Sequence, residues 1–448
     1  MQHREFGGAE PATQTQANKS QSGEAATVLG IQWLTPEERF HSLQVGSVIG
    51  RSEGCELRLD DVSVSRNHAR LEREGPLWLL RDLGSKNGSF VNGERRELAP
   101  LGPQDTVRLG DWVGVVCRLP YEAVASGVYF GELTPGLSFG AATLAGLAKL
   151  RALAASKVPI IILGETGTGK ELLAQAIHTL SGCPGKLIAI NCSAIPEALA
   201  EAELFGHKKG SFTGATESAE GRIAQARRGS LLLDEIVDLP LTIQTKLLRA
   251  LEERAVIPVG SIQAVAVDFR LLAATQEPLD LLVRSGGFRG DLYARLSGAQ
   301  VQLPALRQRR EEILRLLRAA LRPALGREPV FDSLFAESVC KYAWPYNVRE
   351  LMQLARLLAV GGGPSFGVAD LPPRFSQSEG GAPRRVRASR RHLYLTRYAA
   401  ELGRLKSALK GARGNLTEAA RVSGIPRHRA RRLLEAEAAV AQTGAAKR

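Results

Sequence analysis

Two segments of the chain carry residue types that can bind and cleave a phosphate anhydride. The first, GETGTGKE, is a glycine-rich loop whose backbone N–H groups can turn toward phosphate oxygens, and its Lys170 can reach the β and γ phosphates of a nucleotide. The second, GSLLLDEI, ends in Asp234, which could hold Mg²⁺ directly or through water, and Glu235, which could polarise an attacking water. Downstream of such a loop, this acid pair indicates ATP hydrolysis. The predicted nucleotide contacts are Gly164, Glu165, Thr166, Gly167, Thr168, Gly169, Lys170 and Glu171.

This chemistry needs a strand before the loop, a helix after it and a second strand that ends at the acids. The sequence supplies strand-like runs (VPIIIL, KLIAIN, SLLLDE and FRLLAAT) that alternate with helical stretches between about residues 130 and 371. Such alternation predicts a parallel sheet covered by helices. After Asp291 the strand signals fade, which predicts a helical subdomain following the sheet. Residues 28–121 run in short β-rich pieces broken by turn residues, which predicts an all-β sandwich ahead of the α/β domain.

The composition is that of a modular, water-soluble protein. With 448 residues, of which 44% are hydrophobic and 23% charged, the chain should form roughly three folded domains. No apolar run approaches the ~20 residues of a membrane-spanning helix, and the polar first ~23 residues lack a secretory signal. Five widely spaced cysteines suggest no metal cluster and favour a reducing, cytoplasmic setting. For Cys192 a buried structural thiol is favoured over a catalytic one.

Basic charge gathers toward the C-terminal end. From Pro383 onward there are 17 Lys and Arg against 4 Glu, a difference equal to the whole net charge of +13. This concentration is typical of nucleic-acid binding, although a tail that binds acidic membrane or protein would share it. The run GNLTEAARVSGIPRHRARRLL predicts two short helices joined at Ser423 and Gly424, with a basic second helix suited to the major groove. The candidate DNA contacts are Arg427, His428, Arg429, Arg431 and Arg432, and the candidate dimer stripe before them is Leu395, Tyr398, Leu402, Leu405 and Leu409.

With the segment ELFGHKKGSFTGA, the chain closely resembles the bacterial enhancer-binding proteins, which are sigma-54 activators of the AAA+ class. The resemblance covers almost all of residues 130–371. The family's own loop is GETGTGKE, so Glu171 fits where the general P-loop pattern has Ser or Thr. The family signature GAFTGA appears here as GSFTGA, a glycine-flanked surface loop whose Phe212 can grip a partner. The implied sigma-54 contacts are Gly210, Ser211, Phe212, Thr213, Gly214 and Ala215.

The same resemblance implies roles for residues around the catalytic glutamate. INCSAIPE carries Asn191, which in the family holds the catalytic glutamate, here Glu235, until the nucleotide state releases it. FRLLAATQE is similar to the first sensor strand. Thr275 matches the family pattern, whereas Gln276 stands where the family has Asn.

Three arginines are implied to act on the nucleotide. FRGDLYARL is similar to the family's FREDLYYRL, and its Arg289 and Arg295 would reach the γ-phosphate held by the neighbouring subunit. Hydrolysis would therefore require a ring, expected to be a hexamer. WPYNVREL places the second sensor at Arg349. The C-terminal helices resemble the Fis-type domain that usually ends this family.

Near the other end, IGRSEGCELRLDDVSVSRNHARL and LRDLGSKNGSFVNGE resemble the forkhead-associated (FHA) domain, a β-sandwich that binds phosphothreonine. The resemblance implies that basic side chains face the phosphate dianion, and that hydroxyl and amide groups complete the site. His68 and Asn92 are expected to brace the loops. The implied phosphothreonine contacts are Arg51, Ser65, Arg66, Lys86 and Asn87.

The sequence thus predicts a multidomain chain: a disordered tail (1–23), an all-β FHA sandwich (24–122), an α/β AAA+ P-loop ATPase with a helical subdomain (128–372), a linker (373–388) and an all-α Fis-type helix-turn-helix domain (389–440). The expected partners are sigma-54 RNA polymerase, enhancer DNA, a phosphothreonine-containing protein or kinase substrate, and further copies of the chain, from dimer to hexamer. ATP and Mg²⁺ are the expected cofactors. One alternative is a DNA-bound repressor or scaffold whose ATPase is uncoupled, given Ser211 and Gln276. Another is an AAA+ remodeller of other proteins.

Overall fold

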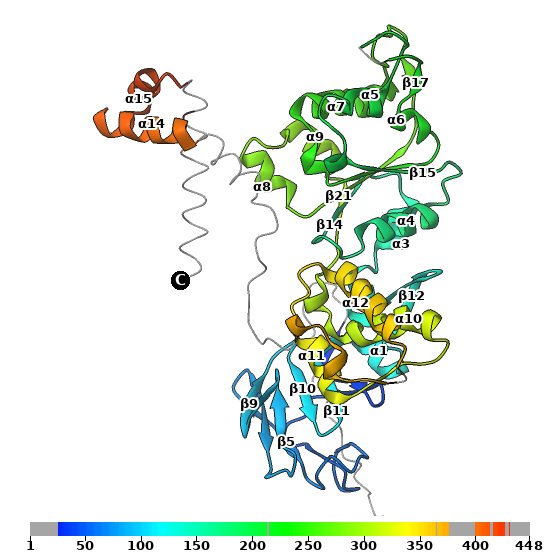
Figure 1. The fold of residues 1–448 in the computed structure, drawn as a ribbon, viewed down its shortest axis with the longest axis vertical. Coiled ribbons are helices and arrows are strands. Elements are labelled where there is room, and N and C mark those ends of the chain that lie inside the picture. Colours follow the sequence, from blue (N-terminus) through cyan, green and yellow to red (C-terminus); the bar gives the residue numbers. More distant parts are fainter. Residues whose placement is uncertain are drawn as a thin grey trace, which may run out of the picture. The chain divides into compact units, whose positions relative to one another are not determined.

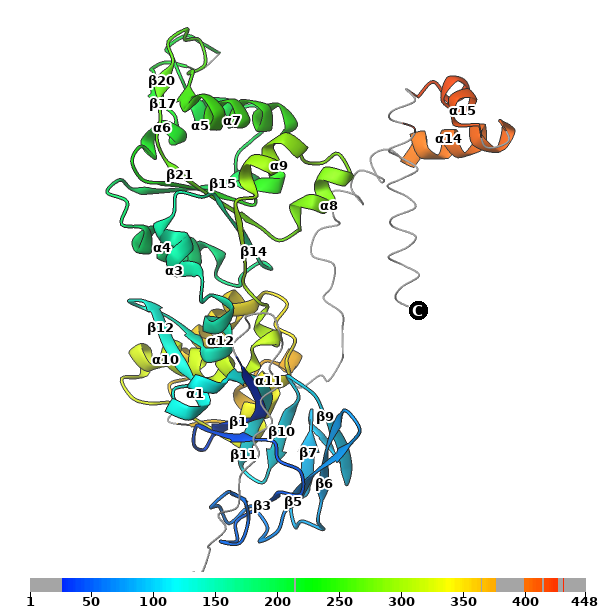
Figure 2. The ribbon, with the colours of Figure 1, turned by 180° about the vertical axis from the view of Figure 1, so that it is seen from behind.

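The computed structural model describes residues 26–212, 215–363, 365–375, 399–412, 415–425 and 430. Their contacts form two compact units (Figures 1 and 2). The first holds the described residues of Met1–Ala148, Leu306–Tyr342 and Leu351–Gln377, and the second those of Lys149–Ala305, Ala343–Glu350 and Ser378–Arg448. Within these described ranges, none of the helices has the length and apolar character needed to cross a membrane.

A two-sheet β-sandwich opens the first unit, as predicted. One sheet has the order β2-β1-β11-β10-β7-β8 and the other the order β4-β3-β5-β6-β9. Inward-facing residues of both sheets fill a core in which the rings of Trp33 and Trp112 meet edge to face, 5.8 Å between centroids. The strands are β1 (Thr27–Thr35), β2 (Arg39–Ser42), β3 (Val48–Gly50), β4 (Leu57–Arg58), β5 (Ala69–Glu74), β6 (Leu77–Asp82), β7 (Ser89–Val91), β8 (Glu94–Arg95), β9 (Leu98–Leu101), β10 (Thr106–Leu109) and β11 (Trp112–Pro120).

Strand β11 departs from the inside–outside alternation of a sandwich strand. Eight of its nine residues are buried, so its outer face must also be covered. The cover comes from α11 (Ser333–Lys341), which packs on β10 and β11, and from α1 (Tyr121–Ser126) and α2 (Ala141–Gly146). The predicted helical subdomain therefore packs on the sandwich.

The rest of the first unit consists of a hairpin and further helical segments. Its elements are β12 (Phe130–Thr134), β13 (Leu137–Gly140), α10 (Ile313–Leu325), β23 (Val330–Phe331), β24 (Ser365–Phe366) and the later part of α12 (Asn347–Gly361).

The second unit contains a parallel sheet with the order β15-β18-β21-β14-β22, as the α/β prediction requires. Its central strands are continuous apolar runs because helices cover both faces. The sheet strands are β14 (Ile160–Leu163), β15 (Leu187–Asn191), β18 (Ser230–Asp234), β21 (Arg270–Thr275) and β22 (Ala299–Gln302). The helices are α3 (Leu150–Ala155), α4 (Lys170–Ser181), α5 (Ala200–Phe205), α6 (Arg222–Gln225), α7 (Leu241–Glu253), α8 (Leu279–Arg284) and α9 (Gly290–Leu296), and short strands are β16 (Gly206–His207), β17 (Ala219–Glu220), β19 (Ala255–Val256) and β20 (Val265–Ala266).

Strand β22 lies after Asp291, where the fading strand signals predicted helical structure. Its sequence AQVQ gives a weak apolar signal because it is a sheet edge and only Val301 is buried. It pairs in parallel with β14, the strand that leads into the glycine-rich loop. Because β14, β18 and β21 are parallel, their carboxyl ends lie at the same end of the sheet, which brings the loop and the acids together.

The described C-terminal part contains α14 (Ala399–Gly411) and α15 (Leu416–Ser423). The Asn415 side chain caps α15 by accepting the Thr417 and Glu418 N–H groups, and Gly424 ends it in a left-handed conformation. Leu405, Ala419, Ala420, Ile425 and Ala430 form a small core. The predicted DNA contacts, Arg427, His428, Arg429, Arg431 and Arg432, lie outside the described residues, as do Leu395 and Tyr398 of the predicted dimer stripe.

Candidate functional site

The glycine-rich loop joins β14 to the N-terminus of α4. Lys170 is nearly buried at the first turn of α4, and its Nζ donates to the Gly164 carbonyl at 3.0 Å and the Glu165 carbonyl at 3.4 Å. Gly167 has φ 78°, and a Cβ there would lie 2.2 Å from the Tyr346 carbonyl oxygen. A side chain at position 167 is therefore excluded both by backbone strain and by space.

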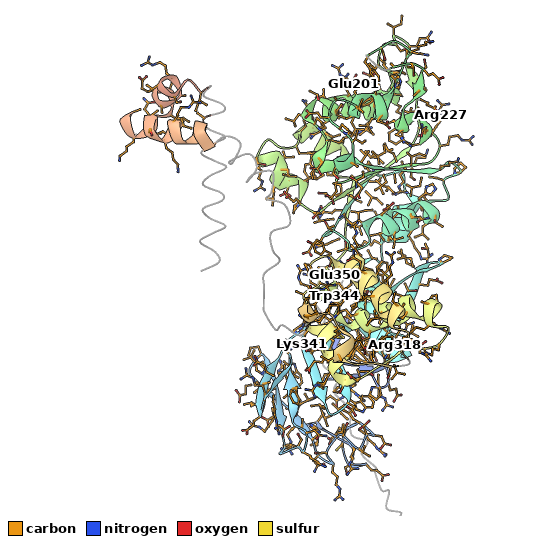
Figure 3. All side chains as sticks on the ribbon, in the orientation of Figure 1. Glu201, Arg227, Arg318, Lys341, Trp344 and Glu350 are labelled. Atoms are coloured by element: carbon orange, nitrogen blue, oxygen red, sulfur yellow. The ribbon has the colours of Figure 1, made fainter. Side chains whose placement is uncertain are left out.

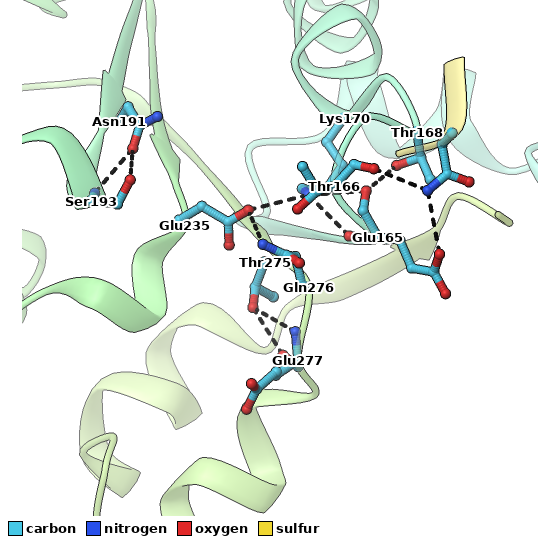
Figure 4. A network of polar contacts seen from close by, with 12 residues as sticks. Glu165, Thr166, Thr168, Lys170, Asn191, Ser193, Glu235, Thr275, Gln276 and Glu277 are labelled. Carbon is cyan, nitrogen blue, oxygen red and sulfur yellow. Dashed lines mark hydrogen bonds and ion pairs between the residues drawn. The ribbon is translucent and has the colours of Figure 1, made fainter. Parts of the chain in front are cut away.

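Asp234 is the last residue of β18 and Glu235 follows it, at the end of the sheet that carries the glycine-rich loop. Figure 4 shows Glu235 beside Lys170 and Gln276. Glu235 has a left-handed backbone (φ 50°, ψ 50°) that turns its carboxylate toward the loop. Its Oε1 lies 3.5 Å from Lys170 Nζ and accepts a hydrogen bond of 2.8 Å from Gln276 Nε2. The glutamate is thus held by one cation and one amide.

The expected contact between Asn191 and Glu235 is not made in this structure. Asn191 Oδ1 instead accepts hydrogen bonds from the N–H and hydroxyl of Ser193, at 3.0 and 2.7 Å. The amide that binds Glu235 belongs to Gln276, whose side chain is one methylene longer than the family's Asn at this position. Thr275 shapes the turn that carries it, because its hydroxyl bonds the Glu277 carbonyl and N–H groups at 2.9 and 3.1 Å.

Asp234 offers a donor for a cation. Its Oδ1 is buried and has no hydrogen-bond partner within the described residues, an arrangement that costs free energy unless a ligand completes it. Mg²⁺ in nucleotide sites is held by one or two carboxylates together with phosphate oxygens. Asp234 fits that donor set. No group of three or more His, Cys, Asp or Glu side chains suited to a metal ion occurs in the described ranges.

The start of α12 closes over the glycine-rich loop. The N–H of Arg349 donates to the Gly167 carbonyl at 3.3 Å, and the Arg349 side chain is exposed beside the loop. Asn347, which the sequence analysis did not single out, donates its Nδ2 to the Thr166 carbonyl at 2.9 Å and to Glu165 Oε2 at 3.3 Å. It lies two residues before Arg349 in the motif WPYNVREL, which was the available signal.

Of the two arginines expected to act across subunits, Arg289 directly precedes α9 and Arg295 lies in its last turn. The Arg289 guanidinium donates hydrogen bonds to the Asp291 carboxylate and, at 3.2 Å, to Thr245 Oγ1. The hydrogen bond and ion pair with Asp291 raise the pKa of Arg289. Arg295 is exposed, with a single long contact to the Leu251 carbonyl at 3.4 Å. Both side chains can therefore be reached from outside the second unit.

The GSFTGA loop projects from the short pair β16–β17. The Gly210 N–H donates to the Ala215 carbonyl at 2.9 Å, and the Ala215 N–H donates to the Phe212 carbonyl at 3.0 Å, which closes the loop on itself. The Phe212 ring is 37% exposed and rests edge-on against His207. Ser211 packs against Gly260, and its hydroxyl is buried without a partner among the described residues. Thr213 and Gly214 lie outside the described residues.

The predicted phosphothreonine contacts gather on adjoining loops of the sandwich. The Ser65 hydroxyl accepts the Lys86 N–H at 3.0 Å, and the Ser65 carbonyl accepts the Arg51 N–H at 3.1 Å. Asn87 Nδ2 donates to the Ser63 carbonyl at 2.7 Å. The side chains of Arg51, Arg66 and Lys86 are exposed, and none makes an ion pair within the described part of the chain.

Two residues brace these loops, as expected. The buried ring of His68 accepts the Ser65 N–H at 3.1 Å and contacts the Gly88 carbonyl at 3.2 Å. Asn92 bonds Asp105 at 2.7 Å and accepts the Thr106 N–H at 3.0 Å.

In the second unit, burial raises the pKa of the Cys192 thiol, which fits a structural thiol.

Fold and site together define a nucleotide-binding AAA+ domain in a chain that also carries an FHA sandwich. Comparison with known families matches the "Sigma-54 interaction domain" over residues 140–302 and the "FHA domain" over residues 47–110. The "Pathogenicity locus probable regulatory protein WtsA" of Pantoea stewartii subsp. stewartii is 44% identical over 216 residues, 47% of this chain and 67% of that protein. The chain belongs to the family of sigma-54-dependent transcriptional regulators.

Further similarities cover part of each relative. The "Sigma54-dependent transcriptional activator SfnR" of Pseudomonas putida is 49% identical over 210 residues, 46% of this chain and 57% of that protein. The crystal structure of NtrX from Brucella abortus is 29% identical, with a TM-score of 0.49 over 67% of this chain and 68% of that one. The chain thus spans somewhat over half to two thirds of the length of these relatives.

Proposed function

We propose that this protein binds enhancer DNA, assembles into a ring and uses ATP hydrolysis to remodel the closed complex of sigma-54 RNA polymerase, under the control of phosphothreonine recognition. The observation that carries the proposal is the constellation around Lys170, Asp234 and Glu235, in the same unit as the exposed Phe212 loop. The first part supplies hydrolysis and the second a surface for a partner.

The residues divide the hydrolytic work among them. The loop N–H groups and Lys170 would bind phosphate oxygens, and the buried oxygen of Asp234 would hold Mg²⁺, which would supply positive charge to the phosphates. When Lys170 turns to phosphate, Glu235 loses its cation partner and keeps only the amide of Gln276. Its second carboxylate oxygen, Oε2, can then orient a water for attack on the γ-phosphate.

The remaining groups complete the site from other copies of the chain. Arg289 or Arg295 of a neighbouring subunit would place positive charge on the γ-phosphate in the transition state. Their accessible positions, at the start of α9 and in its last turn, support this arrangement.

The sandwich supplies the control. A phosphothreonine carries about −1.5 to −2 charges at neutral pH, so the unpaired side chains of Arg51, Arg66 and Lys86 favour it strongly over threonine. The Ser65 hydroxyl would then bind the phosphate and the Asn87 amide the ligand backbone. The basic C-terminal segment supplies the attachment to DNA.

Transcription from a sigma-54 promoter with purified polymerase tests the proposal. We expect transcripts that depend on ATP and on this protein. ATP hydrolysis without transcripts would favour a repressor or scaffold with an uncoupled ATPase instead, an alternative to which the unpartnered Ser211 hydroxyl in the sigma-54 loop gives some support.

A further inference from the structure

The outer face of the sandwich sheet formed by β1, β10 and β11 is covered by helical segments from residues 306–342. Alternation along β11 places Val113 and Val115 on the face opposite Trp112 and Val116, yet all four are buried. A free sandwich would leave that outer face in water. The helical segments that cover this face belong to the same compact unit as the sandwich, and α11 packs on β10 and β11.

Buried charges of the helical segments find their partners on the sandwich. Arg108 of β10 donates to Glu337 of α11 at 2.9 Å, with side chains only 12% and 7% exposed. Gln104 accepts the Arg310 N–H at 2.8 Å and donates to Glu311 at 3.2 Å. Because a buried charge without a partner is costly, these pairs hold the two parts in one register.

A second set of contacts fixes the other end of this interface. Arg318 of α10, labelled in Figure 3, donates to the Leu34 carbonyl at 3.1 Å and to Glu38 at 3.2 Å. Its guanidinium also lies 5.6 Å from the centre of the Phe331 ring. The sandwich is therefore held at two separated places and cannot pivot freely about either one.

A short run of hydrogen bonds leads from the phosphothreonine loops to α11. Asn87 donates to the Ser63 carbonyl, and the Ser63 hydroxyl accepts the Asp111 N–H at 2.8 Å. Asp111 Oδ1 in turn accepts the hydroxyl of Ser333, the first residue of α11, at 3.0 Å. Only Ser63 and Asp111 lie between a candidate ligand contact and the helix.

We propose that the FHA sandwich and the helical segments 306–342 form one rigid module, and that a phosphothreonine ligand acts on the ATPase through Ser63, Asp111 and the interface with α11. The inference rests on the proposed function. A ligand that reorders the adjoining loops of Ser63 and Asn87 changes the hydrogen bond between Asp111 and Ser333 at the start of α11. Along the chain, α11 is followed at once by the segment that carries Asn347 and Arg349.

The test uses the full chain and the variant Arg108→Gln/Ser333→Ala, which removes one buried ion pair and the last link of the path. Arg73→Gln, an exposed arginine on the other sheet, is the matched control. The probe is a peptide pool with a central phosphothreonine and mixed flanking residues, compared with the same pool carrying threonine. Binding is measured by anisotropy, and ATP turnover in parallel.

We expect the phosphorylated pool to bind all three proteins with similar affinity and to change turnover in the wild type and Arg73→Gln. In Arg108→Gln/Ser333→Ala the change in turnover should be smaller by about fivefold or more, the scale of a lost coupling free energy. If that variant binds the pool and responds like the wild type, the inference is wrong while phosphothreonine control stands. If the wild type itself fails to bind the pool, the proposed function of the sandwich fails with it.

Amide hydrogen exchange of the full chain, measured without any ligand, tests the rigid module independently. In the rigid module, Arg108→Gln/Ser333→Ala should speed amide exchange in both α11 and β10–β11, whereas Arg73→Gln should not. Unchanged exchange in α11 would overturn the rigid module even if peptide binding behaves as expected.

Discussion

At the scale of single residues, the finding with most consequence is which amide holds Glu235. The sequence predicted one nucleotide site from the motifs of Lys170, Asp234 and Glu235, and the family resemblance added Gln276 to it. It could not show that the longer Gln276 side chain reaches Glu235, because reach depends on side-chain geometry at the turn after β21. Asn191 was assigned that contact by resemblance, and in this structure it bonds Ser193 instead.

Shortening Gln276 therefore tests its role as a positioning residue. Gln276→Asn restores the family's residue but withdraws the amide from Glu235, and a hydrogen bond to a charged group contributes roughly 1.5–3 kcal/mol. We expect kcat for ATP to fall by about tenfold. KM should change little, because within the described residues the Gln276 side chain bonds Glu235 and no residue of the glycine-rich loop.

Steady-state ATPase kinetics measure both constants. Gln175→Ala, at an exposed position of α4, serves as the control for unrelated loss of an amide. An unchanged kcat in Gln276→Asn would show that Glu235 needs no amide from Gln276.

At the scale of elements, patterns with a strong period predicted the structure and weak ones did not. The central strands of the α/β sheet and the sandwich strands were predicted from apolar runs and turn residues. β22 was missed because an edge strand with one buried residue has little apolar signal. The covered face of β11 could not be predicted, because an all-apolar strand can be buried by any neighbour, and the neighbour here comes from about two hundred residues further along the chain.

The interface also contains a carboxyl group whose ionisation is disfavoured. Burial, together with the neighbouring Glu312, raises the pKa of Glu311 from 4.5 to about 7. The folded state therefore binds this proton more tightly than the unfolded chain. The contribution of Glu311 to stability must then fall as the pH rises from about 4.5 to about 7 and stay low above that.

Glu311→Gln should remove this pH dependence, because the amide is neutral throughout and can still accept the hydrogen bond from Gln104. We expect the variant to be more stable than the wild type at pH 8, by up to about 3 kcal/mol, and similar to it at pH 5. Thermal unfolding midpoints across that range measure the effect, with the exposed Glu97→Gln as control. Parallel curves for wild type and Glu311→Gln would contradict the shifted ionisation.

At the scale of the whole molecule, the sequence predicted the kinds of domain more fully than their grouping. The family resemblance assigned the helical segments after the sheet to the ATPase domain, whereas residues 306–342 pack with the FHA sandwich. Domain order follows from motifs, but packing between domains depends on single pairs such as Arg108 and Glu337, which no motif records.

Assembly into a ring makes a prediction about mixed subunits. Arg289→Ala should lower turnover and spare ATP binding, and Glu235→Gln should do the same for a different reason. In a random mixture of the two, about a quarter of interfaces would pair an intact Glu235 with an intact Arg289, so activity should recover to about that fraction. ATPase assays of the mixture measure it, and no recovery above either variant alone would place Arg289 in its own subunit's site.

Coupling of ATP hydrolysis to remodelling is tested by the opening of promoter DNA in a preformed closed complex of sigma-54 polymerase, followed by permanganate reactivity of unpaired thymines. With ATP, the wild type should produce reactive thymines around the start site. Phe212→Ala should retain ATP turnover close to that of the wild type yet produce none, because the hydrolytic residues lie at the sheet edge and only the loop contact is removed. Promoter opening by Phe212→Ala at the wild-type level would show that the Phe212 loop is not the coupling contact. ATP turnover by the wild type without any opening would show that hydrolysis is not coupled to remodelling.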